Sequence, residues 1–180
     1  MKPPVEMMQI EEEFDQLLHL YDSGPRRRVL EIGSKEGGTL WGFARGAWPG
    51  TKIVSLDLVA PSEHLYASWC PQGVEIAAIQ GDSQTPEIAA QIASYGPFDF
   101  CFIDAAHDYA SVKHDWETYG PMCTGPVAFH DIHHVEGQPE TWDNCEVYRV
   151  WREIQASGRT TREFIHDYGQ QCYGIGVVLP

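Results

Sequence analysis

Short apolar runs alternate along the chain with segments whose apolar residues have helical spacing. Five runs rich in β-branched and aromatic residues predict strands at 29–33, 52–57, 74–80, 98–104 and 126–131. Helices are predicted after the first run, around Leu40 to Phe43, and then at 63–70, 86–95, 109–119 and 146–156. Continuously apolar strands separated by helices favour a parallel sheet that is covered on both faces.

The two ends of the chain depart from this alternation. Residues 5–21 carry apolar side chains mostly three or four positions apart, which predicts an amphipathic helix within an N-terminal segment of residues 1–24. Near the other end, runs at 162–167 and 173–179 are joined by a linker too short for a parallel crossover, so we expect an antiparallel hairpin. A lid is expected at the long loop 132–144. The expected fold is one α/β domain over residues 1–180, doubly wound and mostly parallel.

Charge and composition limit the classes of partner and the cellular location that we expect. Twelve Lys and Arg against 26 Asp and Glu give a net charge of −14, which repels phosphate backbones and argues against a nucleic-acid partner. No apolar run approaches the roughly 18 residues that span a bilayer, and the N-terminus lacks a signal-peptide pattern, so we expect a cytoplasmic protein without a membrane partner. The five cysteines are scattered, odd in number and free of a Cys-x-x-Cys pair, which predicts ordinary reduced thiols.

Acidic residues stand at or near the ends of the five predicted strands: Glu31, Asp57, Asp82, Asp104 and Asp131. In an open α/β sheet, ligands bind outside the carboxyl ends of the strands. Gly33, Gly37 and Gly38 have the spacing Gly-x-x-x-Gly-Gly, which differs from the Gly-x-Gly-x-x-Gly turn that cradles a pyrophosphate. Asp57 at the end of the next strand suits ribose hydroxyls. Together they fit a nucleoside without a diphosphate, although the glycines could form a structural turn and Asp82 could cap one ahead of Ser83.

At this point the sequence resembles a known family. The segments 29–38, 80–83, 98–109 and 129–132 are similar to class I S-adenosylmethionine-dependent methyltransferases, and most of all to small-molecule O-methyltransferases of sugar and antibiotic pathways. The likeness extends from about Arg28 to the C-terminus. It implies a Rossmann-like sheet of seven strands, with the terminal hairpin supplying the antiparallel strand, and methyl transfer to a hydroxyl of a small molecule.

The resemblance also implies roles for individual residues. Glu31 and the Gly33 turn would face the methionine part of the cofactor, Asp57 the ribose, and Asp82 with Ser83 the adenine edge. The complete expected cofactor-binding set is Glu31, Gly33, Ser34, Gly37, Gly38, Asp57, Leu58, Asp82, Ser83 and Asp104.

Asp104 and Asp131 end adjacent predicted strands, so their carboxylates can converge on a hard divalent cation such as Mg²⁺. In the resembled enzymes an acidic pair after the fifth strand completes that site, whereas this chain has His130-Asp131, which shifts the preference toward Mn²⁺ or another ion that accepts imidazole. The expected metal ligands are therefore Asp104, Asp131 and His130. His107 lies one turn beyond Asp104, and these two are the expected catalytic residues, with His107 as the base. A histidine that only caps a helix is the alternative.

Two other classes of function stay open. A non-catalytic nucleoside-binding protein could use the same scaffold. A nicotinamide-dependent dehydrogenase is disfavoured by the glycine spacing and by the acidic cluster, which would repel a pyrophosphate. The sequence leaves open the identity of the acceptor and whether the chain forms a homo-oligomer.

Overall fold

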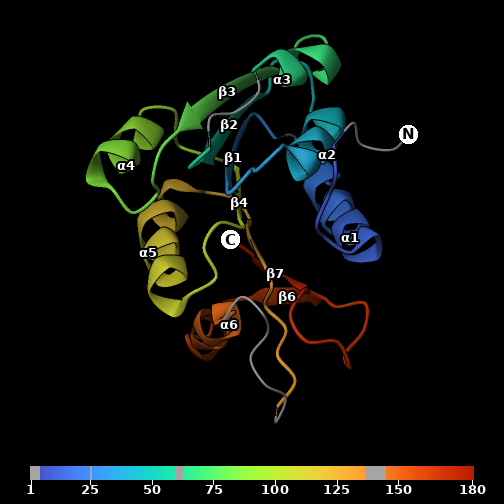
Figure 1. Cartoon of the computed structure of the whole chain (residues 1–180), viewed down its shortest axis with the longest axis vertical. Helices are drawn as coiled ribbons and strands as arrows, with labels where there is room; N and C mark the ends of the chain where they lie inside the picture. Colours follow the sequence, from blue (N-terminus) through green and yellow to red (C-terminus); the bar gives the residue numbers. More distant parts are fainter. Residues whose placement is uncertain (1–4, 25, 60–62, 137–144) are drawn as a thin grey trace.

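A computed structural model describes residues 5–24, 26–59, 63–136 and 145–180 of the chain. Its centre is a seven-stranded sheet with strand order β3-β2-β1-β4-β5-β7-β6 (Figure 1). The strands are β1 (Arg28–Ile32), β2 (Lys52–Asp57), β3 (Glu75–Gln80), β4 (Phe100–Ile103), β5 (Val127–His130), β6 (Thr161–Phe164) and β7 (Ile175–Val178). The helices are α1 (Glu11–Asp22), α2 (Gly38–Gly46), α3 (Glu63–Trp69), α4 (Pro86–Ala93), α5 (Tyr109–Tyr119) and α6 (Val147–Ala156), with a 3-10 turn η1 (Gly120–Met122).

The strand pairings confirm the predicted fold class. Strands β1 to β5 are parallel to one another, and β7 runs antiparallel to both β5 and β6. The strand order reverses between β1 and β4, because the chain builds outward from β1 to β3 and then returns to add β4. A ligand site is expected at such a switch point, outside the carboxyl ends of the strands.

Strand β4 shows why the central strands are apolar at every position. Phe100 and Phe102 pack into a cluster with α1 and α2, whereas Cys101 and Ile103 pack into a second cluster on the other face. Figure 1 shows α1 and α2 on one side of the sheet and α4 and α5 on the other. Since successive side chains point to opposite faces, a strand covered on both sides needs apolar residues throughout.

The N-terminal segment differs from the prediction. Helix α1 begins at Glu11 rather than at residue 5, and Ile10 before it has an extended backbone. Three glutamates occupy the first turn, where the positive end of the helix dipole favours negative charge. The preceding residues run against the start of α2 instead: a Cβ on Gly38 would lie 2.5 Å from the carbonyl oxygen of Glu6.

The predicted lid lies partly outside the described residues, which include 132–136 but not 137–144, so it stays a prediction. Among the described residues, no helix has both the length and the apolar character that a membrane crossing requires.

Candidate active site

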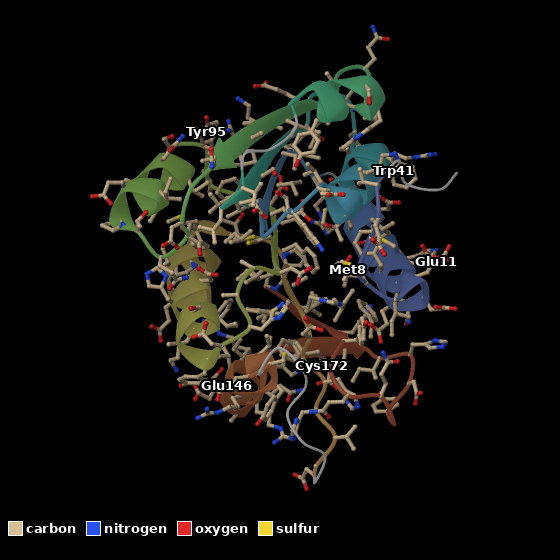
Figure 2. All side chains as sticks on the ribbon, in the orientation of Figure 1. Met8, Glu11, Trp41, Tyr95, Glu146 and Cys172 are labelled. Atoms are coloured by element: carbon tan, nitrogen blue, oxygen red, sulfur yellow. The ribbon has the colours of Figure 1, made fainter. Side chains whose placement is uncertain are left out.

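A cavity of about 660 Å³ opens at the carboxyl ends of the parallel strands. Its wall includes residues that follow β1, β2, β3, β4 and β5: Gly33, Ser34, Gly38, Asp57, Leu58, Asp82, Ser83, Asp104 and Asp131. Figure 2 labels two further wall residues, Met8 and Cys172, which come from opposite ends of the chain. A volume of this size lies within the roughly 300 to 1,000 Å³ typical of small-molecule sites.

The turn after β1 passes directly against the end of β4. Gly33 has φ +90°, and a Cβ there would lie 2.0 Å from the carbonyl oxygen of Asp104. Only glycine combines this backbone conformation with that close approach. Gly37, with φ +89°, precedes the first residue of α2. The turn therefore packs tightly against the end of β4, and Gly33 and Ser34 line the cavity there.

Both carboxylate oxygens of Asp57 accept hydrogen bonds from the main chain. Its Oδ2 accepts a hydrogen bond from the backbone N–H of Lys35 at 2.6 Å, and its Oδ1 accepts one from Val59 at 2.9 Å. A carboxylate oxygen can accept more than one hydrogen bond, so Asp57 keeps capacity for ligand hydroxyls. Leu58 beside it is largely exposed and lines the cavity.

Asp82 and Ser83 form the next part of the wall. Asp82 Oδ1 accepts the backbone N–H of Gln84 at 2.9 Å, so this side chain does stabilise a turn while also lining the cavity. Gln84 donates from Nε2 to Asp115 Oδ1 at 2.9 Å. Asp115 is fully buried in α5, and burial raises its pKa to about 6. Sequence reasoning missed Gln84 and Asp115, because their positions carry no strand-end signal.

Glu31 lies behind the wall and not on it. Its carboxyl group is completely buried and accepts a hydrogen bond from the hydroxyl of Thr39, while Oε2 has no partner among the described residues. Burial raises the pKa of Glu31 to about 8. The side chain is therefore mostly neutral at neutral pH, and its expected contact with the methionine part stays a prediction.

Asp104, His107 and Asp131 form a compact group on the opposite side of the cavity. One ligand atom from each lies within 4.8 Å of the others. His107 Nε2 is 3.3 Å from Asp131 Oδ2 and 4.0 Å from Asp104 Oδ1. Two carboxylates and an imidazole at such distances can surround one divalent cation.

His130, the third expected ligand, lies against the same carboxylates. Its Nδ1 is 3.3 Å from Asp104 Oδ1 and 3.2 Å from Asp131 Oδ2, and the ring is 5% exposed. Burial opposes protonation of the ring, but the two carboxylates outweigh it and raise the pKa of His130 well above its ordinary value. Burial likewise opposes ionisation of Asp131, yet His130 lowers the pKa of that carboxyl. Protonated His130 is therefore a buried cation whose charge partly neutralises the carboxylates of Asp104 and Asp131.

Distant segments hold the acidic group in position. Gln9 donates from Nε2 to Asp104 Oδ2 at 2.5 Å, and the backbone N–H of Tyr173 donates to Asp131 Oδ1 at 2.8 Å. Asp131 itself has φ +60°, an unusual conformation outside glycine. Sequence reasoning placed Gln9 in a helix and Tyr173 in a strand, so it found neither contact.

The fold and the cavity define an α/β protein with one pocket at the strand ends that contains an acidic cluster. Residues 30–132, more than half of the chain, match the family described as a methyltransferase domain, and the chain belongs to that family. No curated protein matches the chain.

Several solved structures share the fold. The O-methyltransferase from Bacillus cereus in complex with SAH has a TM-score of 0.70 at 20% identity, covering 99% of this chain and 84% of that chain. TomG from Streptomyces achromogenes, an O-methyltransferase involved in tomaymycin synthesis solved with SAM, has a TM-score of 0.68 at 20% identity, covering 92% and 78%. MycE from the mycinamycin biosynthetic pathway, solved with Mg and SAH, has a TM-score of 0.61 at 21% identity, covering 92% of this chain but 48% of that chain.

Proposed function

We propose that this protein transfers a methyl group from S-adenosylmethionine to a hydroxyl group of a small molecule, with a divalent cation held by Asp104 and Asp131. The observation that carries the proposal is that one cavity is lined both by the glycine turn with Asp57 and by the group Asp104, His107 and Asp131. The similarity to structures solved with SAM, SAH and Mg supports the same reading.

The residues of the first half of the cavity fit the cofactor. Gly33, Ser34 and Gly38 line the cavity, and the carboxylate of Asp57 has acceptor capacity for ribose hydroxyls. Ser34 and Gly38 would bind at the methionine part, Leu58 beside the ribose, and Asp82 with Ser83 at the adenine edge. Gly37 is not part of the cavity wall and would act only by shaping the turn. When bound, S-adenosylmethionine supplies an electrophilic methyl group on a sulfonium, so the protein contributes mainly positioning and charge stabilisation.

The residues of the second half fit an acceptor hydroxyl and a cation. Two carboxylates are enough to bind Mg²⁺, which keeps several waters. His107 Nε2 would take the proton of the hydroxyl, and Asp131 Oδ2, 3.3 Å away, would stabilise the resulting imidazolium. A cation on all three residues would occupy that nitrogen, so we assign the base role to His107 and the ligand role to the two acids. His130 then balances their charge.

A small acceptor is favoured over a nucleic acid because the net charge of −14 repels phosphates. The single-domain organisation, the lid and the cytoplasmic location stay predictions.

The test measures binding and transfer separately. Calorimetry should detect S-adenosylhomocysteine binding, and a pool of hydroxylated metabolites should accept the labelled methyl group of S-adenosylmethionine, with stimulation by Mg²⁺ that a chelator removes. Cofactor binding without transfer to any acceptor, with and without Mg²⁺, would instead establish a binding protein. Tight NADH binding without cofactor binding would establish a dehydrogenase.

A further inference from the structure

Two cysteines far apart in the sequence meet on the acidic side of the cavity. Cys145, just before α6, is 4% exposed, and Cys172, just before β7, is half-buried; both line the cavity. Cys172 packs against the buried cluster that contains Cys145, and its thiol, together with burial, raises the pKa of Cys145. Cys172 is labelled in Figure 2. The scattered cysteines of the sequence thus include one close pair.

The segments that carry the two cysteines both contact Asp131. The thiol of Cys145 donates to the carbonyl oxygen of Asp131 at 3.6 Å. On the other side, Tyr173, the residue after Cys172, donates its backbone N–H to the carboxylate of Asp131. Cys172 and Tyr173 have φ +63° and +59°, a conformation that costs non-glycine residues free energy unless the surroundings hold it. A change at either sulfur therefore acts directly on the segment that holds Asp131.

We propose that Cys145 and Cys172 form a dithiol modification site for low-molecular-weight disulfides, at which exchange produces an intramolecular Cys145–Cys172 disulfide.

The exchange takes place in two balanced steps. Cys172, the more exposed of the two, attacks one sulfur of the small disulfide, which forms a mixed disulfide and releases one small thiol. Cys145 then attacks the sulfur of Cys172, which forms the internal disulfide and releases the second small thiol. The two cysteine protons leave with the two small thiols, and the small disulfide is the species that is reduced.

The other three cysteines lack this arrangement. Cys70 and Cys123 donate to nearby carbonyl oxygens, and Cys101 is buried in β4. None of the three lines the cavity. Cys123 is half-buried like Cys172, so it is the matched control for exposure.

The expected consequence rests on the proposed function. Closing the bond brings the sulfur atoms to about 2.05 Å and shifts the segment that carries Tyr173. Asp131 then loses its main-chain donor, and turnover falls. Binding of S-adenosylhomocysteine is retained, because the glycine turn and Asp57 are not attached to this segment.

The experiment treats reduced protein with oxidised glutathione, alkylates the remaining thiols and maps peptides by mass spectrometry. We expect a linked pair of peptides containing Cys145 and Cys172, no stable glutathione adduct, and alkylation of the other three cysteines. Cys145→Ser should accumulate glutathione on Cys172, Cys172→Ser should acquire neither modification, and Cys123→Ser should form the same link as the wild type. A stable glutathione adduct on wild-type Cys172, a link to another cysteine, or full alkylation of Cys172 after oxidation would overturn the proposal.

A turnover measurement distinguishes the failure of the disulfide proposal from the failure of the proposed function. A loss of at least tenfold on oxidation, restored by dithiothreitol and absent in Cys172→Ser, is the expected result. Full turnover with the mapped link in place would refute the effect on Asp131. A reduced protein that is inactive toward every acceptor would instead refute the proposed function, while the mapping result stands by itself.

Discussion

The two halves of the cavity are built in different ways. In the half that contains Gly33, Asp57 and Asp82, called the nucleoside half after its proposed ligand, nearby turns hold the functional groups. Asp57 accepts from residues two and 22 positions away, and Asp82 from a residue two positions away. In the acidic half, Asp104 contacts Gln9 across 95 positions and Asp131 contacts Tyr173 across 42. The first half is therefore held by contacts within residues 33–84, whereas the second also receives hydrogen bonds from both ends of the chain.

The pKa values of the buried carboxyl groups also differ between the two halves. Within the part of the chain that the structure describes, Glu31 has one hydroxyl partner and no paired cation, and burial raises its pKa to about 8. Asp131 is almost as buried, but His130 lies 3.2 Å away and its pKa is lowered. A nearby cation is what keeps a buried acid ionised.

The largest effect is expected at Asp131. Asp131→Asn keeps an oxygen for the backbone N–H of Tyr173 but removes the charge that a cation needs. We expect turnover to fall roughly 1000-fold, because a metal supplies several kcal/mol of stabilisation, with all Mg²⁺ stimulation lost. Affinity for S-adenosylhomocysteine should change less than about twofold. The control is Asp167→Asn, an exposed carboxylate in the hairpin loop; equal losses in both variants would contradict the assignment.

His107→Ala should lower turnover by roughly 100-fold at neutral pH, within the range of general base catalysis. Added imidazole should restore part of the activity, because a small base can enter the space left by the ring. Mn²⁺ affinity, measured by paramagnetic resonance, should be nearly unchanged if the nitrogen serves as a base. A large loss of Mn²⁺ affinity without rescue would show that His107 is a metal ligand.

The sequence predicts that Gly33 and Asp57 meet at one edge of the sheet, because the signals for this are local. The apolar run of β1, Gly33 after it, and Asp57 at the end of β2 each follow from neighbouring residues, and parallel pairing then brings them to one edge. Asp104 and Asp131 meet for the same reason, since β4 and β5 are neighbours.

The sequence could not predict contacts that depend on the packing of the chain ends. Gln9 belongs to a segment with helical spacing, yet it turns away from α1 to reach Asp104. Cys145 and Cys172 have no sequence signature, because their approach depends on how the segment before α6 meets the hairpin. The choice between His107 and His130 likewise depends on distances around two carboxylates that spacing does not determine.

Glu31→Gln should alter the pH dependence of stability. A carboxyl group with a higher pKa in the folded state binds its proton more tightly there, so stability falls as pH rises from about 4.5 to about 8. Removing this group should flatten the curve and make the variant more stable than the wild type at neutral pH, by on the order of 2 kcal/mol. Chemical denaturation at several pH values measures this. Parallel curves for the two proteins would mean that Glu31 is ionised when folded.

Asp57→Ala should weaken S-adenosylhomocysteine binding by roughly 10- to 100-fold, since hydrogen bonds to a charged group contribute about 1.5 to 3 kcal/mol. Calorimetry measures the affinity, and thermal unfolding checks that the lost bonds to Lys35 and Val59 leave the fold intact. Mn²⁺ binding on the other side of the cavity should stay the same. Unchanged cofactor affinity would remove Asp57 from the ribose site.

The smallest effect is expected at Gln9, and it tests whether the acidic half depends on the chain end. The amide of Gln9 donates to Asp104 Oδ2 at 2.5 Å, so Gln9→Ala leaves that carboxylate less well oriented. Gln9 touches neither ligand and acts only through the orientation of Asp104, so Mn²⁺ affinity and acceptor KM should worsen only about fivefold, which corresponds to about 1 kcal/mol. Gln9→Glu should be worse than alanine, because it places a third negative charge beside Asp104. Gln16→Ala, at an exposed position of α1, is the control and should behave as the wild type. If Gln9→Ala matched that control in Mn²⁺ affinity and KM, Asp104 would be positioned by β4 alone, and the contrast between the two halves would rest on Asp131.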